Sequence, residues 1–232
     1  MWSEWLQSPL FSLTLTIGIY VLAQGIYRRT SIIIFNPVAL AIAGIIAVLL
    51  TLHIPYETYD RGGRYLLFLL GPAVVALGVP LYQRRQEIVR RKVPILAGVA
   101  AGALTSVITA SGTAWLLGAS ASTVRSMAPK SVTTPIAIGI SDKIGGISPL
   151  TAAIVVATGC LGGMCGPEFC RMIGIRSPAS MGLAVGTAAH GIGTARMLEI
   201  DRLGGAIAGL AIGLNGLVTA VLVPLLFIIF PV

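Results

Sequence analysis

Three long apolar runs constrain this chain more than any other feature of its sequence. Residues 36–54, 93–117 and 203–231 contain no Asp, Glu, Lys or Arg, and a membrane-spanning helix needs about 20 consecutive apolar residues. Only 10% of all residues are charged, whereas a soluble domain carries about 25%. The sequence therefore predicts an all-α polytopic membrane protein. It argues against a disordered chain, a nucleic-acid-binding domain and almost any soluble enzyme.

Further apolar segments bring the expected number of membrane segments to about seven or eight, at about 20 residues each. Segment 65–82 is interrupted at Gly71, and segment 179–197 by several glycines around His190. Segment 127–141 is short and rich in proline, so we expect it to be partly re-entrant. The candidate segments are 9–27, 36–54, 65–82, 93–117, 127–141, 147–165, 179–197 and 203–231.

The charge distribution predicts the orientation of the chain. The formal net charge is +8, and five of the 16 Lys and Arg residues lie in the loop 84–92. Short loops rich in Lys and Arg stay in the cytoplasm, which places Arg28 and Arg29 inside and the loop 55–64 and the N-terminus outside. The first eight residues contain Glu4 and no Lys or Arg. We therefore expect no cleavable signal peptide and a first segment that remains as an anchor.

Two parts of the chain share a pattern of small residues. The motif A-G-x-A-x-G occurs at residues 97–102 and again at 208–213, and a looser match relates 71–78 to 186–193. Gly is common in membrane helices, so a chance match is the alternative. Two matches in the same order favour a duplication. The predicted organisation is a single integral membrane domain over residues 1–232, with repeats at about 10–115 and about 130–230.

Duplicated units with broken helices are typical of secondary transporters. A break exposes backbone N–H and C=O groups, which must be buried in protein or line a cavity. Helix N-termini that meet at such a break offer partial positive charge to an anionic solute. We therefore predict an elevator-transporter-like arrangement in which 65–82 and 179–197 cross near the middle of the membrane.

The stretch from 129 to 135 is the first candidate site. Lys130 lies between two prolines and beside the hydroxyl groups of Ser131, Thr133 and Thr134. Ionisable residues within the membrane are functional candidates by default, and a cation with several hydroxyls suits a carboxylate. The alternative is a lysine that extends to the membrane surface.

The stretch from 186 to 195 is the second candidate site. Its glycines permit a break, its hydroxyl groups can bind a solute, and His190 titrates near neutral pH and is a candidate for proton transfer. The alternative is a histidine that bonds a backbone carbonyl in a tightly packed bundle. The site residues predicted here are Thr187, His190, Gly191, Gly193 and Thr194.

Two residues of the first half complete the predicted site. Gly71 lies at the break of segment 65–82. Asn36 precedes Pro37, which is the usual pattern of a helix cap; the alternative is a side chain that reaches a cavity.

Signatures of other chemistry are missing. The chain has no G-x-S-x-G, H-E-x-x-H or Walker A motif, and Ser131 with His190 is its sole candidate nucleophile–base pair. Cys160, Cys165 and Cys170 fit no zinc pattern and are expected to pack as small apolar residues. We expect no enzyme, no metal and no cofactor.

Three blocks of sequence resemble the LrgB/CidB family: LLGPAVVALGVPLY at 69–82, PKSVTTPIA at 129–137 and HGIGTA at 190–195. The resemblance covers nearly the whole chain. It implies a protein of the bacterial inner membrane that works with a smaller, holin-like membrane partner of the LrgA/CidA type. It also implies a link to murein hydrolase export and autolysis. Other members, and a related plastid translocator of glycolate and glycerate, carry small carboxylates.

The main hypothesis is a secondary transporter of small monocarboxylates or hydroxycarboxylates, such as pyruvate, glycolate and lactate. Movement would be coupled to protons through His190. The rival hypothesis is an antiholin-like regulator of murein hydrolase export that acts as a pore component and needs no substrate site. The partners expected are the LrgA-type protein, the lipid bilayer and further copies in an oligomer, and no nucleic acid.

Overall fold

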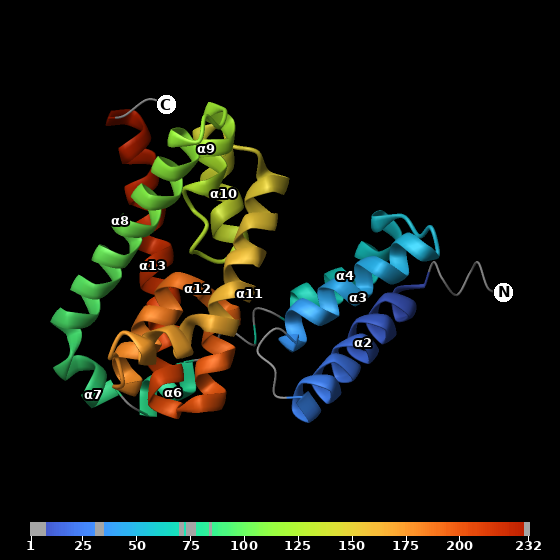
Figure 1. Ribbon diagram of the computed structural model, residues 1–232, viewed down its shortest axis with the longest axis horizontal. Coiled ribbons are helices and arrows are strands. Elements are labelled where there is room, and N and C mark those ends of the chain that lie inside the picture. The colour runs from blue at the N-terminus through green and yellow to red at the C-terminus, as the bar shows by residue number, and fades with distance from the viewer. Residues whose placement is uncertain (1–7, 31–34, 70–71, 73–77, 84, 230–232) are drawn as a thin grey trace. The chain divides into compact units, whose positions relative to one another are not determined.

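The computed structural model describes residues 8–30, 35–69, 72, 78–83 and 85–229, and every regular element in that part of the chain is an α-helix (Figure 1). The chain forms two compact units, Met1–Leu77 and Gly78–Val232. The first contains α2 (Pro9–Thr30), α3 (Pro37–Thr51) and α4 (Tyr56–Phe68). The second contains α6 (Gly78–Gln83), α7 (Arg85–Arg90), α8 (Lys92–Leu116), α9 (Ala121–Met127), α10 (Thr134–Ile144), α11 (Ser148–Met172), α12 (Pro178–Ile200) and α13 (Arg202–Ile229).

Four helices in the described part of the chain are long and apolar enough to cross a membrane, namely α2, α8, α11 and α13. Helix α3 is apolar but has 15 residues. Large apolar side chains such as Leu22, Ile108 and Leu217 are exposed along these helices, which suits contact with lipid. The prediction of an all-α membrane protein is confirmed. The total of seven or eight segments and the duplication stay predictions.

The first unit is held together by contacts of α2 with α3 and α4. The Thr16 and Tyr59 hydroxyl oxygens lie 2.8 Å apart and join α2 to α4. Gly44 of α3 packs so closely against Ile19 of α2 that an added Cβ would lie 2.9 Å from its side chain. Small residues allow membrane helices to approach in this way.

Two segments predicted as loops are helical instead. Helix α4 covers most of 55–64, where the Arg64 side chain donates to Asp60 across one turn at 2.9 Å. Such a pair stabilises a helix that has few apolar residues at its start. Helix α7 likewise covers most of 84–92. The charge of a segment indicates its side of the membrane, but it does not distinguish a loop from a surface helix.

Helix α12 is broken and folds back on itself, so the predicted span 179–197 is not one rod. Its backbone leaves helical geometry at Ala189 and His190, where His190 has φ +41°. A straight helix of its 23 residues would be about 34 Å long. Its first residue, Pro178, nevertheless lies against Gly204, just beyond its last residue, and Gly193 lies against Val185. The predicted break is confirmed, and at this break the chain reverses its direction.

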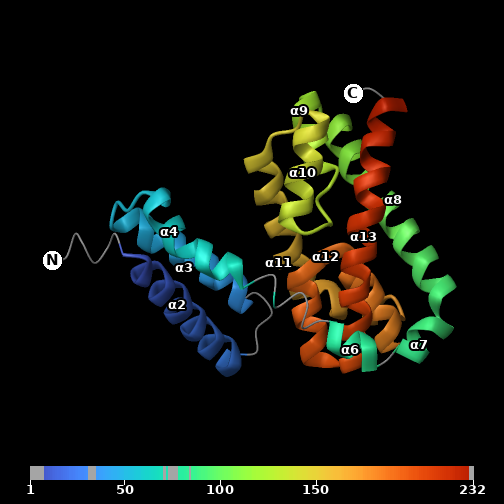
Figure 2. The ribbon, with the colours of Figure 1, turned by 180° about the vertical axis from the view of Figure 1, so that it is seen from behind.

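Helices α9 and α10 form a second hairpin, and its re-entry into the membrane stays a prediction. These helices have 7 and 11 residues, far fewer than a span needs, and residues 128–133 join them as a non-helical connector. The Ile147 N–H, just past α10, donates to Ser126 of α9 at 2.7 Å. Helix α10 therefore returns the chain to the level of α9. Figures 1 and 2 show α9 and α10 towards one end of α13 and α12 towards the other.

Glycines bring α12 and α13 into backbone contact. A Cβ added at Gly182 would overlap the Gly204 carbonyl, and one at Gly186 would lie 2.5 Å from the Ala208 carbonyl oxygen. At Gly213, further along α13, an added Cβ would meet nothing within 4 Å. The close contact therefore lies along the first half of α13.

The change Gly186→Ala should lower the free energy of unfolding by about 1–3 kcal/mol, because the new methyl group overlaps α13. Gly213→Ala should leave stability unchanged or raise it, because alanine is the better helix former and the site is open. Thermal unfolding of the detergent-solubilised protein measures both changes. Equal stability of the two variants would contradict the packing described here.

Candidate functional site

A cavity of about 550 Å³ in the second unit brings the two candidate stretches together. Its walls come from α8, from the connector 128–133 and from α12. The lining residues are Gly98, Ala101, Gly102, Thr105, Ser106, Lys130, Ser131, Ser180, Leu183, Ala184, Thr187 and Ala188. Lys130 is the one charged residue in this lining, so the cavity has a positive charge and no carboxylate to balance it.

Lys130 is half-buried at the wall of the cavity and belongs to a chain of polar contacts. Its Nζ donates to Ser131 Oγ at 3.3 Å, and Ser131 Oγ lies 2.6 Å from Ser106 Oγ of α8. Ammonium and hydroxyl groups thus converge where the connector meets α8. Such a group of donors can bind a carboxylate.

Thr187 lines the cavity from α12, and its hydroxyl group is buried. The residue is 5% exposed, and its Oγ1 has no hydrogen-bond partner among the described residues. An unpaired buried hydroxyl costs about 1–3 kcal/mol relative to a paired one. The Oγ1 atom itself has almost no solvent-accessible surface, so a ligand in the cavity would reach this hydroxyl only after a movement of α12.

Asn215 lies behind the cavity, in the middle of α13. Its Nδ2 donates to the Ser131 carbonyl at 3.1 Å and to the Thr187 carbonyl at 3.0 Å. Neither Asn215 nor Ser106 is among the predicted site residues. The signal for Asn215 was available, because an amide within a long apolar span is unusual and tends to bond across helices.

His190 faces α11 and is not among the residues that line the cavity. Its Nε2 lies 2.9 Å from the Val155 carbonyl oxygen, and its ring packs against Gly159. This arrangement agrees with the alternative given in the sequence analysis, in which His190 bonds a backbone carbonyl within a packed bundle. Its role in proton transfer stays a prediction.

The other predicted residues around the α12 turn also lie outside the lining. The Thr194 hydroxyl donates to the His190 carbonyl at 2.9 Å. Gly193 packs against Val185, and Gly191 faces open space. These residues shape the turn of the hairpin.

The remaining predicted residues lie apart from the cavity or outside the described residues. Thr133 caps α10 through its backbone, and Thr134 begins that helix; neither belongs to the lining. Asn36 is in the first unit, and its Oδ1 accepts the N–H groups of Val38 and Ala39 at 2.9 and 3.2 Å, so its role as a helix cap is confirmed. Gly71 is outside the described residues.

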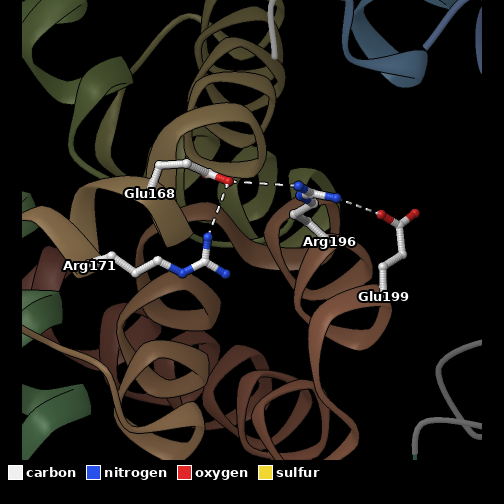
Figure 3. A network of polar contacts seen from close by, with 4 residues as sticks. All are labelled: Glu168, Arg171, Arg196 and Glu199. Atoms are coloured by element: carbon white, nitrogen blue, oxygen red, sulfur yellow. Dashed lines mark hydrogen bonds and ion pairs between the residues drawn. The ribbon is translucent and has the colours of Figure 1, made fainter. Parts of the chain in front are cut away.

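A separate charged cluster joins α11 to the returning half of α12 (Figure 3). The Glu168 carboxylate lies 3.9 Å from the Arg171 guanidinium and 3.7 Å from that of Arg196. Arg196 also bonds Glu199 at 3.1 Å. Its members do not line the cavity, so we regard the cluster as a link between the two helices.

The contact between His190 and Gly159 can be tested by paired substitutions. Gly159→Ala would place a methyl group 2.5 Å from the His190 ring and should cost about 1–3 kcal/mol of stability. In a His190→Ala background the cost should fall, because the ring is absent. Thermal unfolding measures all four proteins, with Gly112→Ala, at an open position of α8, as the control. The same cost in both backgrounds would show that the ring does not pack there.

Comparison with known proteins agrees with the resemblance noted in the sequence. The model of the LrgB-like family matches residues 16–229. The chain is 34% identical to protein YwbG of Bacillus subtilis over 215 residues, which are 93% of this chain and 96% of the relative.

Other bacterial relatives carry a descriptive name. The chain is 32% identical to "Holin-like protein CidB" of Staphylococcus epidermidis over 228 residues, 98% of this chain and 99% of the relative. It is 31% identical to the protein of the same name in Staphylococcus aureus over 221 residues, 95% and 96% of the two chains. No solved structure matches. Together with its apolar helices, these matches identify a multi-pass bacterial membrane protein that belongs to the LrgB-like family.

Proposed function

We propose that this protein is a secondary transporter of small monocarboxylates or hydroxycarboxylates, of the pyruvate, glycolate and lactate class. The observation that supports the proposal is the cavity between the connector and α12. Its lining combines one cation, Lys130, with the hydroxyls of Ser106 and Ser131 and with no acidic residue.

The chemistry of the lining suits an anion with one carboxylate and a nearby oxygen. The Lys130 ammonium would bind the carboxylate by a charge-assisted hydrogen bond. The Ser106 and Ser131 hydroxyls bond each other, so one of the two has a hydrogen left to donate alongside it. The Thr187 hydroxyl would bond a hydroxyl or keto oxygen only once a movement of α12 exposes it.

We propose that the α9–α10 hairpin and the α12 hairpin are both re-entrant, and that their movement would alternate access to the cavity. They approach the cavity from opposite ends of α13, so movement of either one would open the cavity to one side only. Elevator-like movement of this kind is the mode that we propose. Coupling to protons through His190 would act on the α12 turn, since the ring bonds α11 and not the cavity lining.

The setting of the transporter is part of the proposal. We place it in the bacterial inner membrane with the basic segment 84–92 in the cytoplasm, because short segments rich in Lys and Arg are retained there. A smaller membrane protein of the LrgA/CidA type would be its partner.

A second candidate function is favoured by the name of the relatives, "Holin-like protein CidB". In this alternative the protein regulates murein hydrolase export as a pore component, together with its partner. It would need no solute site, so changes in the cavity lining would leave its activity intact.

Uptake of labelled pyruvate, glycolate and lactate into proteoliposomes tests the proposal. The purified chain is used alone and with an LrgA-type partner, with and without a pH gradient. Lys130→Met should reduce saturable uptake about tenfold or more, because a hydrogen bond to a charged group contributes about 1.5–3 kcal/mol. Lys143→Met, at an exposed lysine of α10, is the matched control and should keep full uptake.

Two other outcomes would count against this function. Equal saturable uptake by the Lys130→Met and Lys143→Met proteins would show that the substrate does not bind in this cavity. Unselective leakage that requires the partner and shows no saturation would favour the pore component.

A further inference from the structure

The amide of Asn215 is fully used, although the residue lies within a helix that is otherwise almost entirely apolar. The side chain is 1% exposed. Both hydrogen atoms of its amide nitrogen have acceptors, the carbonyls of Ser131 and Thr187 at 3.1 and 3.0 Å. Its oxygen accepts the Thr219 hydroxyl, one turn further along α13, at 3.3 Å.

The two carbonyls have one feature in common: each belongs to an interrupted part of the backbone. Ser131 is in the non-helical connector 128–133. In a regular helix the Thr187 carbonyl would accept a hydrogen bond from the N–H of residue 191. That bond would cross the break at Ala189 and His190. Buried carbonyls near such breaks need partners from elsewhere.

Ser131 and Thr187 also line the cavity, one from the connector and the other from α12. A single amide on α13 therefore joins the backbones of both walls from behind. On the α13 side of the cavity, this amide is the described hydrogen-bonding group that links Ser131 to Thr187.

We propose that Asn215 is the positioning residue of the cavity, a clamp that holds the connector and the α12 turn at the separation needed to bind a ligand. The identity of that ligand rests on the proposed transport function, whereas the positioning role of Asn215 does not. Thr219 fixes the orientation of the Asn215 amide. Its hydroxyl donates to the amide oxygen, so the amide nitrogen points towards the two carbonyls.

The change Asn215→Asp tests the clamp with little change in side-chain volume. An ionised carboxylate has no donor, and a protonated one has a single O–H for two carbonyls. Packing in the middle of α13 is kept, while the link between the walls is lost. Thr219→Val removes only the hydroxyl that orients the amide. Thr109→Val is the matched control, because the Thr109 hydroxyl bonds carbonyls of its own helix.

Initial rates of pyruvate uptake into proteoliposomes give the first readout. Asn215→Asp should raise KM about tenfold, which corresponds to about 1.4 kcal/mol, with little change in the maximal rate. Thr219→Val should raise KM by a smaller factor, and Thr109→Val should not change it. A residue that matters only for folding would lower the maximal rate through the amount of active protein and leave KM unchanged, which would overturn the clamp.

Spin labels give a second readout that does not need transport. They are placed at Lys143 of α10 and at Ala195 of α12 in a full chain whose native cysteines are replaced by alanine. Pulsed electron paramagnetic resonance should give a narrow distance distribution, which broadens with Asn215→Asp and, to a smaller extent, with Thr219→Val. An unchanged distribution in both variants would overturn the clamp. If the unaltered chain carries no carboxylate but the distribution still broadens, the transport function fails and the clamp stands.

Discussion

Lipid offers no hydrogen bonds, so every break in a membrane helix needs a partner for the backbone groups that it leaves open. The second unit contains two such breaks, the connector 128–133 and the turn at Ala189 and His190. One side chain, Asn215, supplies donors to both. In a medium of low dielectric constant these bonds are strong, and their absence would be costly. This interaction ties the connector and α12 to the middle of α13.

The clamp works because small residues bring the backbones within its reach. An asparagine side chain is short, so its amide can bond the backbones of two neighbours only where both lie close to its own helix. Gly182 and Gly186 allow this for α12, whose backbone touches that of α13. Gly102 of α8 makes room for the Thr187 side chain, since an added Cβ would lie 2.9 Å from its methyl group. Close packing and hydrogen bonding therefore depend on each other, because the glycines set the distance between the helices that the Asn215 amide must span.

The sequence predicts what depends on local composition and misses what depends on distant contacts. The apolar runs 36–54, 93–117 and 203–231 correspond to α3, α8 and α13, and the candidate segment 147–165 corresponds to the first part of α11. The glycines around His190 identify the break in α12. That the break reverses the chain is not visible, because a kinked span and a hairpin have the same local pattern. Lys130 and Thr187 are found as polar groups in apolar segments. Asn215 is missed as a site residue because its partners lie 84 and 28 residues away in the chain, and His190 is assigned to the cavity although its ring faces α11.

The distribution of polar groups in the second unit bears on the choice between a transporter and a pore component. A pore needs polar groups along its whole length. Here Ser106, Lys130 and Thr187 gather around one cavity. The hydroxyls of Ser141 and Thr151 form a separate pair, 2.7 Å apart, in which the two groups satisfy each other within the fold. In the described part of the chain, Lys130 is the charged residue of this cavity lining. A polar cavity between the connector and α12 is what we expect of the proposed transporter, in which the cation would select an anionic solute.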